Sequence, residues 1–163
     1  MKKFELTNEF ITNMFGTKLF RIRALVEFGD VEAGELGGYV EKESNLGHDD
    51  NAWVYDNAWV YGNARVCGDA RVCGDARVCS DEDYAYAHGF GSVNRTTTFF
   101  CLKDGGVGVR CGCFYGTLAQ FRDKIRETHG ETKKAQEYLM LADLMELRFE
   151  EDENEVGNRK YVE

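Results

Sequence analysis

A six-residue repeat constrains this chain more than any other feature of its sequence. Residues 51–80 read NAWVYD, NAWVYG, NARVCG, DARVCG and DARVCS, and nothing is inserted between the five units. Every unit has Ala at its second position and Val at its fourth, so these two residues lie on one face of an extended segment. A period of six does not match a helical turn, and the glycine, asparagine or aspartate between units favours a corner. The repeat therefore predicts short strands joined by similar turns.

This pattern resembles the hexapeptide repeat of left-handed parallel β-helix proteins, in which an aliphatic residue is followed four positions later by a small one. Val54 and Ala58 are the first such pair, and Val72 and Ala76 are the last. The resemblance implies a triangular coil in which residues roughly 18 apart are stacked on one another. On this map Trp53 lies beside Arg71, Trp59 beside Arg77, Tyr55 beside Cys73, and Tyr61 beside Cys79. A two-residue insertion near His48 and Asp49 shifts the frame before the repeat.

We accordingly expect a mainly β fold, a short left-handed parallel β-helix of about three coils with an N-terminal strand cap and a C-terminal ββαα lobe. The expected parts are a cap over residues 1–36, the β-helix over 37–92, a β-hairpin with two helices over 93–149, and an acidic disordered tail over 150–163. In the cap, Phe20, Ile22 and Ala24 alternate with arginines, as in a half-buried strand.

The C-terminal lobe has turn and helix signals of its own. Asp104-Gly105 lies between two β-rich runs and predicts a hairpin that sets Leu102 opposite Val107, Phe100 opposite Val109 and Thr98 opposite Cys111. A capping box from Thr117 to Gln120 begins a helix that ends near His129, with Leu118, Phe121 and Ile125 on its buried face. A second helix is expected from about residue 132 to residue 149. Its apolar face is listed in sequence order as Tyr138, Leu141, Leu144, Met145 and Leu147.

The outward-facing positions of the repeat are the candidate ligand or interface site. They combine aromatic rings with guanidinium groups and are Trp53, Tyr55, Trp59, Tyr61, Arg65, Arg71 and Arg77. One interpretation is that they pack against a second subunit or against the terminal parts of the same chain. The alternative is a nucleotide site, in which a ring stacks on a base and the arginines bind phosphate.

No catalytic residue, metal site or cofactor is expected. Cys67, Cys73 and Cys79 are six residues apart and so lie on three different sides of the coil, where they cannot share a metal ion. Acyltransferases of the hexapeptide class use a histidine as general base, and His88 or His48 could take that role. We interpret His88 instead as a capping residue at the end of the coil.

Charge and hydropathy restrict the partners. The net charge of −9 argues against direct DNA binding, and no apolar run is long enough for a membrane span. The first residues lack a secretory signal, and six cysteines without one indicate a reducing, cytoplasmic environment. Residues 143–163 hold eight acidic and three basic residues, which would suit competition for a basic channel on a host protein.

Residues 18–40 followed by the repeat also resemble small accessory proteins of bacteriophages and prophages. That resemblance implies a non-catalytic protein that binds a host protein or protein complex in the bacterial cytoplasm, most concretely an anti-defence inhibitor. Such an inhibitor would block a CRISPR-type effector or sequester a nucleotide signal. The alternatives are an acyl-CoA-dependent acyltransferase and a structural assembly protein. A homo-oligomer, either a trimer or a dimer, is also expected.

Overall fold

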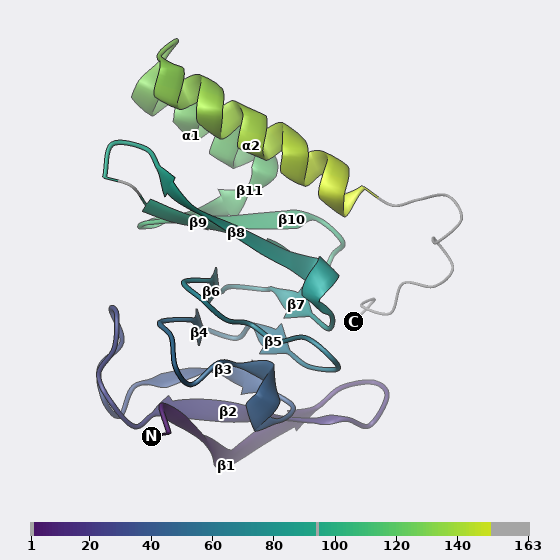
Figure 1. Cartoon of the computed structure of the whole chain (residues 1–163). Helices are drawn as coiled ribbons and strands as arrows, with labels where there is room; N and C mark the ends of the chain where they lie inside the picture. The colour runs from purple at the N-terminus through teal and green to yellow at the C-terminus, as the bar shows by residue number, and fades with distance from the viewer. Residues whose placement is uncertain (1, 94, 151–163) are drawn as a thin grey trace.

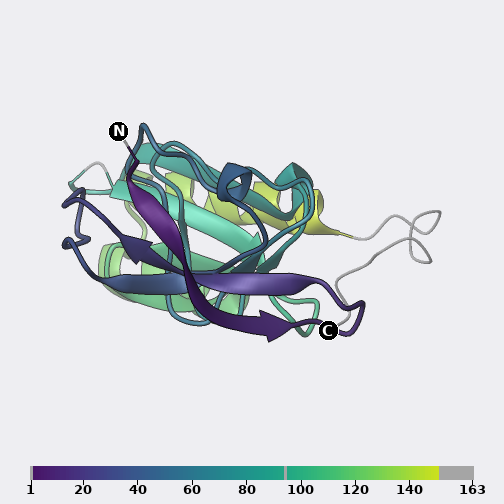
Figure 2. The same ribbon diagram turned by 90° about the horizontal axis from the view of Figure 1, so that it is seen from below.

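The computed structural model describes residues 2–93 and 95–150, and it places the six-residue repeat between antiparallel N-terminal strands and a four-stranded antiparallel sheet (Figure 1). A mixed sheet begins with the N-terminal strands, continues into the repeat and has the order β1-β2-β3-β5-β7. Its strands are β1 (Phe4–Thr12), β2 (Lys18–Ala24), β3 (Leu36–Val40), β5 (Trp59–Val60) and β7 (Arg77–Val78). The parallel strands β4 (Trp53–Val54) and β6 (Arg71–Val72) form a small second sheet. Figure 2 shows the β1–β2 hairpin lying across the end of the molecule.

The far end of the repeat is covered by an antiparallel sheet and two helices. The sheet has the order β11-β10-β9-β8. Its strands are β8 (Tyr84–Phe90), β9 (Arg95–Cys101), β10 (Val107–Cys111) and β11 (Phe114–Thr117). Helices α1 (Leu118–His129) and α2 (Lys133–Phe149) cover the face of this sheet that points away from the repeat (Figure 1). Two short 3-10 helices, η1 (Glu43–Asn45) and η2 (Asp81–Asp83), lie just before and just after the repeat.

The predicted left-handed parallel β-helix is wrong. The strands are divided among three sheets, of which one is mixed and one is antiparallel, and no continuous parallel β-helix forms. Each repeat unit contributes at most two residues to a ladder, and Val66 makes only an isolated bridge to Leu46. The flanking segments turn back instead of winding onward, since β1 pairs antiparallel with β2 and β8 pairs antiparallel with β9. Gly16 and Gly91, which follow β1 and β8, both have a positive φ. The expectation of a mainly β chain is confirmed.

The spacing within the repeat was nevertheless predicted correctly. Trp53 pairs with Arg71 and Trp59 with Arg77, both at a separation of 18 residues. Across the expected insertion the separation between paired residues is 20, since Val40 pairs with Val60. The alanines and valines of the repeat point inward and are fully buried, and they form one core with Phe4 and Ile22 at one end and Phe100 at the other.

The N-terminal cap departs from strict alternation. Ile22 and Ala24 are buried as expected, but Phe20 is only half-buried and Leu19 is buried in its place. The register of β2 against β3 shifts between Arg21 and Arg23, which changes the side of the sheet that each neighbouring residue faces.

The C-terminal lobe confirms both helices and corrects the hairpin. Thr117 caps α1 through its side chain, and Leu118, Phe121 and Ile125 are buried. The hairpin register differs by one residue from the prediction, because Phe100 pairs with Gly108 and Phe99 with Val109. The innermost pair is Cys101 with Val107, and Gly105 in the turn between them has a φ of 90°. The fourth strand of this sheet, β11, was not predicted.

The apolar face expected for α2 is only partly correct. Tyr138 and Met145 are buried, together with Ala135 and Ala142, whereas Leu144 and Leu147 are 53% and 66% exposed. The predicted tail from residue 150 onward lies outside the described residues except for Glu150. Neither described helix is long and apolar enough to cross a membrane.

Close packing at Gly37 leads to a stability prediction. A Cβ added at Gly37 would lie 2.7 Å from the Trp53 ring and 2.6 Å from the Val54 carbonyl oxygen. We expect Gly37→Ala to lower the free energy of unfolding by about 1–3 kcal/mol, because β3 would have to move away from the repeat. Urea denaturation would measure this. Gly106→Ala is the matched control, since its added Cβ would approach only the Asp104 side chain, at 3.2 Å, and Leu102; equal losses for the two variants would contradict the prediction.

Burial of the Cys73 thiol leads to a pH-dependent prediction. Burial raises the pKa of Cys73 from 9.0 to about 11, against the smaller opposite effect of Arg110. The unfolded chain therefore loses this proton near pH 9 while the folded chain keeps it, so the thiol contributes stability below pH 9 that is lost between pH 9 and 11. Replacing Cys73 by Ala should make the decline in unfolding free energy shallower by about 1.4 kcal/mol per pH unit in this window. Identical slopes for the two proteins in urea denaturation would refute this explanation.

Candidate functional site

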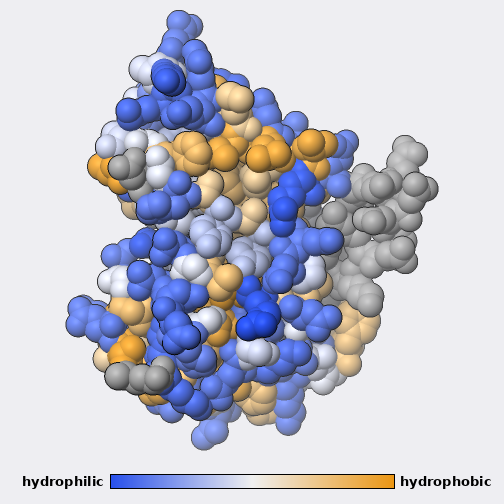
Figure 3. All heavy atoms as spheres, viewed as in Figure 1, coloured by the Kyte–Doolittle hydropathy of each residue, from blue (hydrophilic) through white to orange (hydrophobic). Residues whose placement is uncertain are grey.

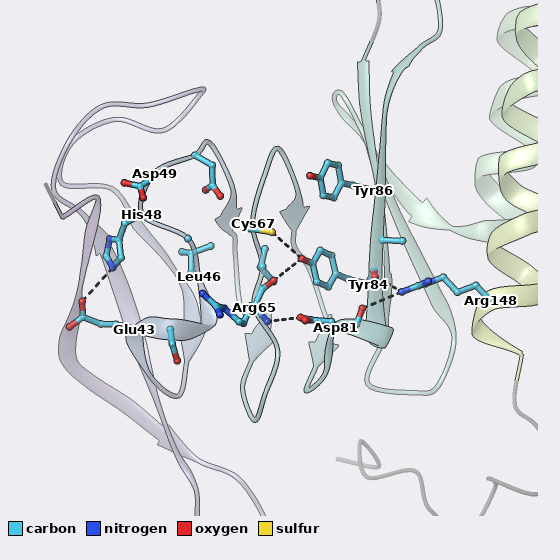
Figure 4. A pocket seen from close by; sticks show the side chains of 15 residues that line it. Glu43, Leu46, His48, Asp49, Arg65, Cys67, Asp81, Tyr84, Tyr86 and Arg148 are labelled. Atoms are coloured by element: carbon cyan, nitrogen blue, oxygen red, sulfur yellow. Dashed lines mark hydrogen bonds and ion pairs between the residues drawn. The ribbon is translucent and has the colours of Figure 1, made fainter.

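An open groove of about 930 Å³ lies on one side of the repeat (Figure 4). One wall is the loop from Glu43 to Asp50, which contains the insertion predicted from the sequence. The opposite wall is formed by η2 and the start of β8, with Arg148 from the end of α2 beside it. Residues Arg65 to Cys67 of the repeat form the floor between them. The groove thus joins segments that are distant in the sequence.

Apolar and aromatic groups line the bottom of the groove. Leu46 and Val66 are buried and form a bridge between their backbones. The Tyr84 hydroxyl donates a hydrogen bond to the Arg65 carbonyl oxygen at 2.7 Å and lies 3.8 Å from the Cys67 sulfur. Burial raises the pKa of Tyr84, so this phenol remains a protonated donor. The neighbouring Tyr86 is 40% exposed and presents an aromatic surface to a ligand.

Four carboxylates surround this floor: Glu43, Asp49, Asp50 and Asp81. Both carboxylate oxygens of Asp50 already have partners within the chain, because they accept hydrogen bonds from the Gly68 amide and the Lys3 ammonium group. Asp81 accepts from the Arg65 amide through one oxygen, which leaves the other facing solvent. Asp49 is exposed and makes no hydrogen bond or ion pair with another described residue. Asp49 and Asp81 are therefore the carboxylates best placed to meet a ligand.

His48 is held in place through both ring nitrogens. Its ring stacks on Phe4 with centroids 4.3 Å apart, and its Nδ1 accepts a hydrogen bond from the Lys3 amide at 3.1 Å. A nitrogen that accepts cannot carry the proton, so the neutral ring is protonated at Nε2, which lies 3.4 Å from a Glu43 oxygen. His48 therefore joins the loop to the first strand.

Two arginines bring positive charge into the groove. Arg148 donates hydrogen bonds to the carbonyl oxygens of Asp81 and Tyr84, at 3.2 and 3.1 Å, and so connects α2 to the edge of β8. The Arg65 side chain is exposed, and its guanidinium group makes no hydrogen bond or ion pair with any other residue that the structure describes. With four acidic and two arginine side chains, the described lining of the groove is net acidic.

The seven outward positions predicted as a ligand or interface surface do not lie together. Only Arg65 lines the groove. Trp53 is fully buried against Phe4 and Phe28 of the N-terminal part, which agrees with the interpretation that such residues pack on the terminal segments. Its neighbour on the stacking map, Arg71, forms an ion pair with Asp30 at 2.9 Å.

The remaining four predicted residues also make contacts within the chain. The Arg77 guanidinium carbon lies 3.8 Å from the centroid of the Trp59 ring. Arg77 and Tyr61 are both buried. Tyr55 is half-buried, and the Arg110 guanidinium carbon lies 4.9 Å from the centroid of the Tyr55 ring. These contacts remove most of the aromatic surface that a stacked nucleobase would require.

A second hollow of about 700 Å³ contains His88, Arg71 and Arg95. The His88 Nδ1 atom is 2.7 Å from the Thr96 hydroxyl and 4.0 Å from an Asp69 oxygen, and its side chain is exposed. His88 lies within β8, so its predicted role as a cap of the coil is not what the structure shows. The cysteines of the repeat differ in burial as well as position, since Cys73 is buried and Cys67 exposed. Among the residues that the structure describes, no three His, Cys, Asp or Glu side chains are grouped as a metal site would need.

Sequence reasoning missed the acidic wall of the groove. Asp49 lies in the insertion that precedes the repeat, Asp50 follows it directly, and Asp81 follows the last unit. Acidic residues at the two ends of the periodic segment were therefore the sequence signal for this groove. Among comparisons with known proteins, no family model matches this chain and no curated protein is similar enough to count as a relative.

Lys3 anchors the Glu43–Asp50 loop, and this leads to a stability prediction. Its ammonium group is buried and donates hydrogen bonds to the carbonyl oxygens of Asp50 and Ala52 and to the Asp50 carboxylate. Burial lowers the pKa of Lys3 from its ordinary value. We expect Lys3→Met to reduce the free energy of unfolding by about 1–3 kcal/mol and to speed amide hydrogen exchange over residues 47–52, because those acceptors lose their donor.

The neighbouring lysine provides the control. Lys2 makes an exposed ion pair with Glu43, at 3.1 Å, so Lys2→Met should change stability by less than about 0.5 kcal/mol. Unchanged hydrogen exchange over residues 47–52 in Lys3→Met would show that the loop does not depend on this anchor.

Proposed function

We propose that this protein is a non-catalytic binding protein that uses the acidic groove to hold a basic surface of a host protein. The observation that carries the proposal is the combination of exposed carboxylates at Asp49 and Asp81 with an aromatic and aliphatic floor. Carboxylates steer and orient cationic partners, and the apolar floor supplies area that leaves water on binding. The host setting, a bacterial cytoplasm, follows from the resemblance to phage accessory proteins.

An anti-defence inhibitor is the concrete form of this proposal. Many defence effectors bind nucleic acid through channels lined by Lys and Arg, and an acidic groove is complementary to such side chains. Blocking a CRISPR-type effector is therefore favoured over sequestering a nucleotide. A nucleotide would bring its phosphates against four carboxylates, and among the described lining residues Arg65 and Arg148 are the arginines that could offset them.

The acyltransferase alternative receives less support from the geometry. The histidine in the groove, His48, has one nitrogen on the Lys3 amide and the other facing Glu43, so the ring serves to hold the loop. A general base would need a ring nitrogen directed at the reacting group.

Charge reversal in the groove tests the proposal. The tagged protein would be incubated with purified CRISPR effector complexes and with lysate from a bacterial host, and retained proteins would be identified by mass spectrometry. We expect an Asp49→Lys, Asp81→Asn variant to bind its partner about tenfold more weakly or worse, and we expect wild-type binding to weaken as salt is raised. Asparagine at position 81 keeps an oxygen for the Arg65 amide.

A matched control changes the same total charge elsewhere. Glu131→Lys with Glu127→Gln alters two exposed residues at the end of α1, away from the groove. This variant should bind like wild type. Equal binding by the groove variant and the control would refute the proposal, and a shift in melting temperature with nucleotides alone would favour the nucleotide alternative.

A further inference from the structure

The four-stranded sheet has an unpaired edge beside the groove. Its strand order ends at β8, which pairs only with β9, and no other described strand lies along its second side. The Tyr84 carbonyl oxygen accepts from Arg148, so it points away from β9. In an antiparallel strand the direction of the backbone groups alternates, so the amide and carbonyl groups of Tyr86 and His88 also face this edge. An open edge of this kind is a template for another strand.

Above this edge, toward the helices, the surface is apolar. Ala85 packs against the core that the helices share with the sheet, and α2 contacts β8 directly. Leu141 is half-buried and Leu144 is 53% exposed on α2. Figure 3 shows apolar side chains gathered along and beneath α2 on this face of the molecule. A strand added to β8 would direct every second side chain toward this apolar surface.

Below the edge, toward the repeat, the surface is acidic. The side chains of Tyr84 and Tyr86 point to this side and line the groove together with Asp49 and Asp81 (Figure 4). The other side chains of an added strand would enter the groove. The two sides of the edge therefore require opposite chemistry, with apolar residues facing α2 and cationic residues facing the carboxylates.

We propose that an extended segment of the partner, with alternating apolar and basic residues, adds to β8 as a fifth strand of this sheet. The inference rests on the proposed function and specifies how the basic partner is held. Backbone hydrogen bonds to Tyr86 and His88 hold the segment, and alternation of its side chains gives specificity. Arg148 already occupies the Tyr84 carbonyl oxygen, so the added strand begins beyond it.

Synthetic peptides test the strand addition directly. The probe is a fluorescent peptide of about seven residues in which lysine and valine alternate, compared with the same peptide N-methylated at every second residue. N-methylation at the residues that face β8 removes the amide donors while keeping charge and apolar area. We expect the parent peptide to bind, with amide chemical shift changes in β8, and the peptide methylated on the β8 side to bind about tenfold more weakly or worse. Methylation of the alternate residues should have a smaller effect.

Protein variants test the two sides of the edge. Leu144→Glu should weaken peptide binding at least about fivefold, because it places a carboxylate in the apolar surface beside β8. Met140→Glu is the matched control on the same helix, since Met140 is 71% exposed and lies one turn earlier. It should leave the affinity near that of wild type.

The outcomes separate this inference from the proposed function. Equal affinity for the parent and both methylated peptides, or no binding of the parent peptide, overturns strand addition. In either case, loss of the host partner from the Asp49→Lys, Asp81→Asn variant would still support the acidic groove. Retention of that partner by the variant would instead overturn the proposed function on which this inference rests.

Discussion

The buried rows of alanine and valine inside the repeat are the constraint on which the rest of the structure depends. A unit of six residues has too little apolar area to exclude water from its own interior, so each unit relies on the next. The rows are fully buried because something also covers the first and the last unit. At one end Phe4 and Ile22 complete the core, and at the other end Phe100 and Leu102 do so. The antiparallel strands at the two ends are therefore the parts that make a short repeat stable.

The need for covers also explains the mixed architecture. Parallel strands of two residues offer few hydrogen bonds, so the repeat is held by its core and by its turns more than by its ladders. The antiparallel strands at both ends are longer and can supply the missing backbone pairing. The Leu102 bridge to Ala76 and the bond from the Arg71 amide to Thr98 join β9 to the last units. The last units of the repeat are therefore covered by another part of the same chain.

Sequence reasoning succeeded where the signal was local and periodic. The separation of 18 residues between Trp53 and Arg71 follows from three units of six, and the change to 20 at Val40 and Val60 follows from the insertion. The cap at Thr117 follows from a four-residue motif. Reasoning from the same periodicity failed for the fold as a whole. The residues of the repeat do not determine whether the flanking segments continue the coil or pair as antiparallel strands.

The surface of the repeat could not be predicted from its own residues. Trp53 and Trp59 occupy equivalent positions, yet Trp53 lies between Phe4 and Phe28 while Trp59 lies beneath Arg77. What covers each ring comes from segments distant in sequence. Of the seven predicted residues, only Arg65 therefore lines the groove. The carboxylates of the groove were missed because aspartates at turns are normally explained by turn geometry alone.

The position of the groove follows from where the period is broken. Within the repeat the corners recur every six residues with similar residues. The insertion at His48 and Asp49 lies in a loop that forms one wall of the groove, and hydrogen bonds of Lys3 to His48 and Ala52 hold this loop. On the other side, the chain leaves the repeat at η2 and becomes the edge strand β8. Between these two departures the chain presents an unpaired strand edge and carboxylates that the core does not use.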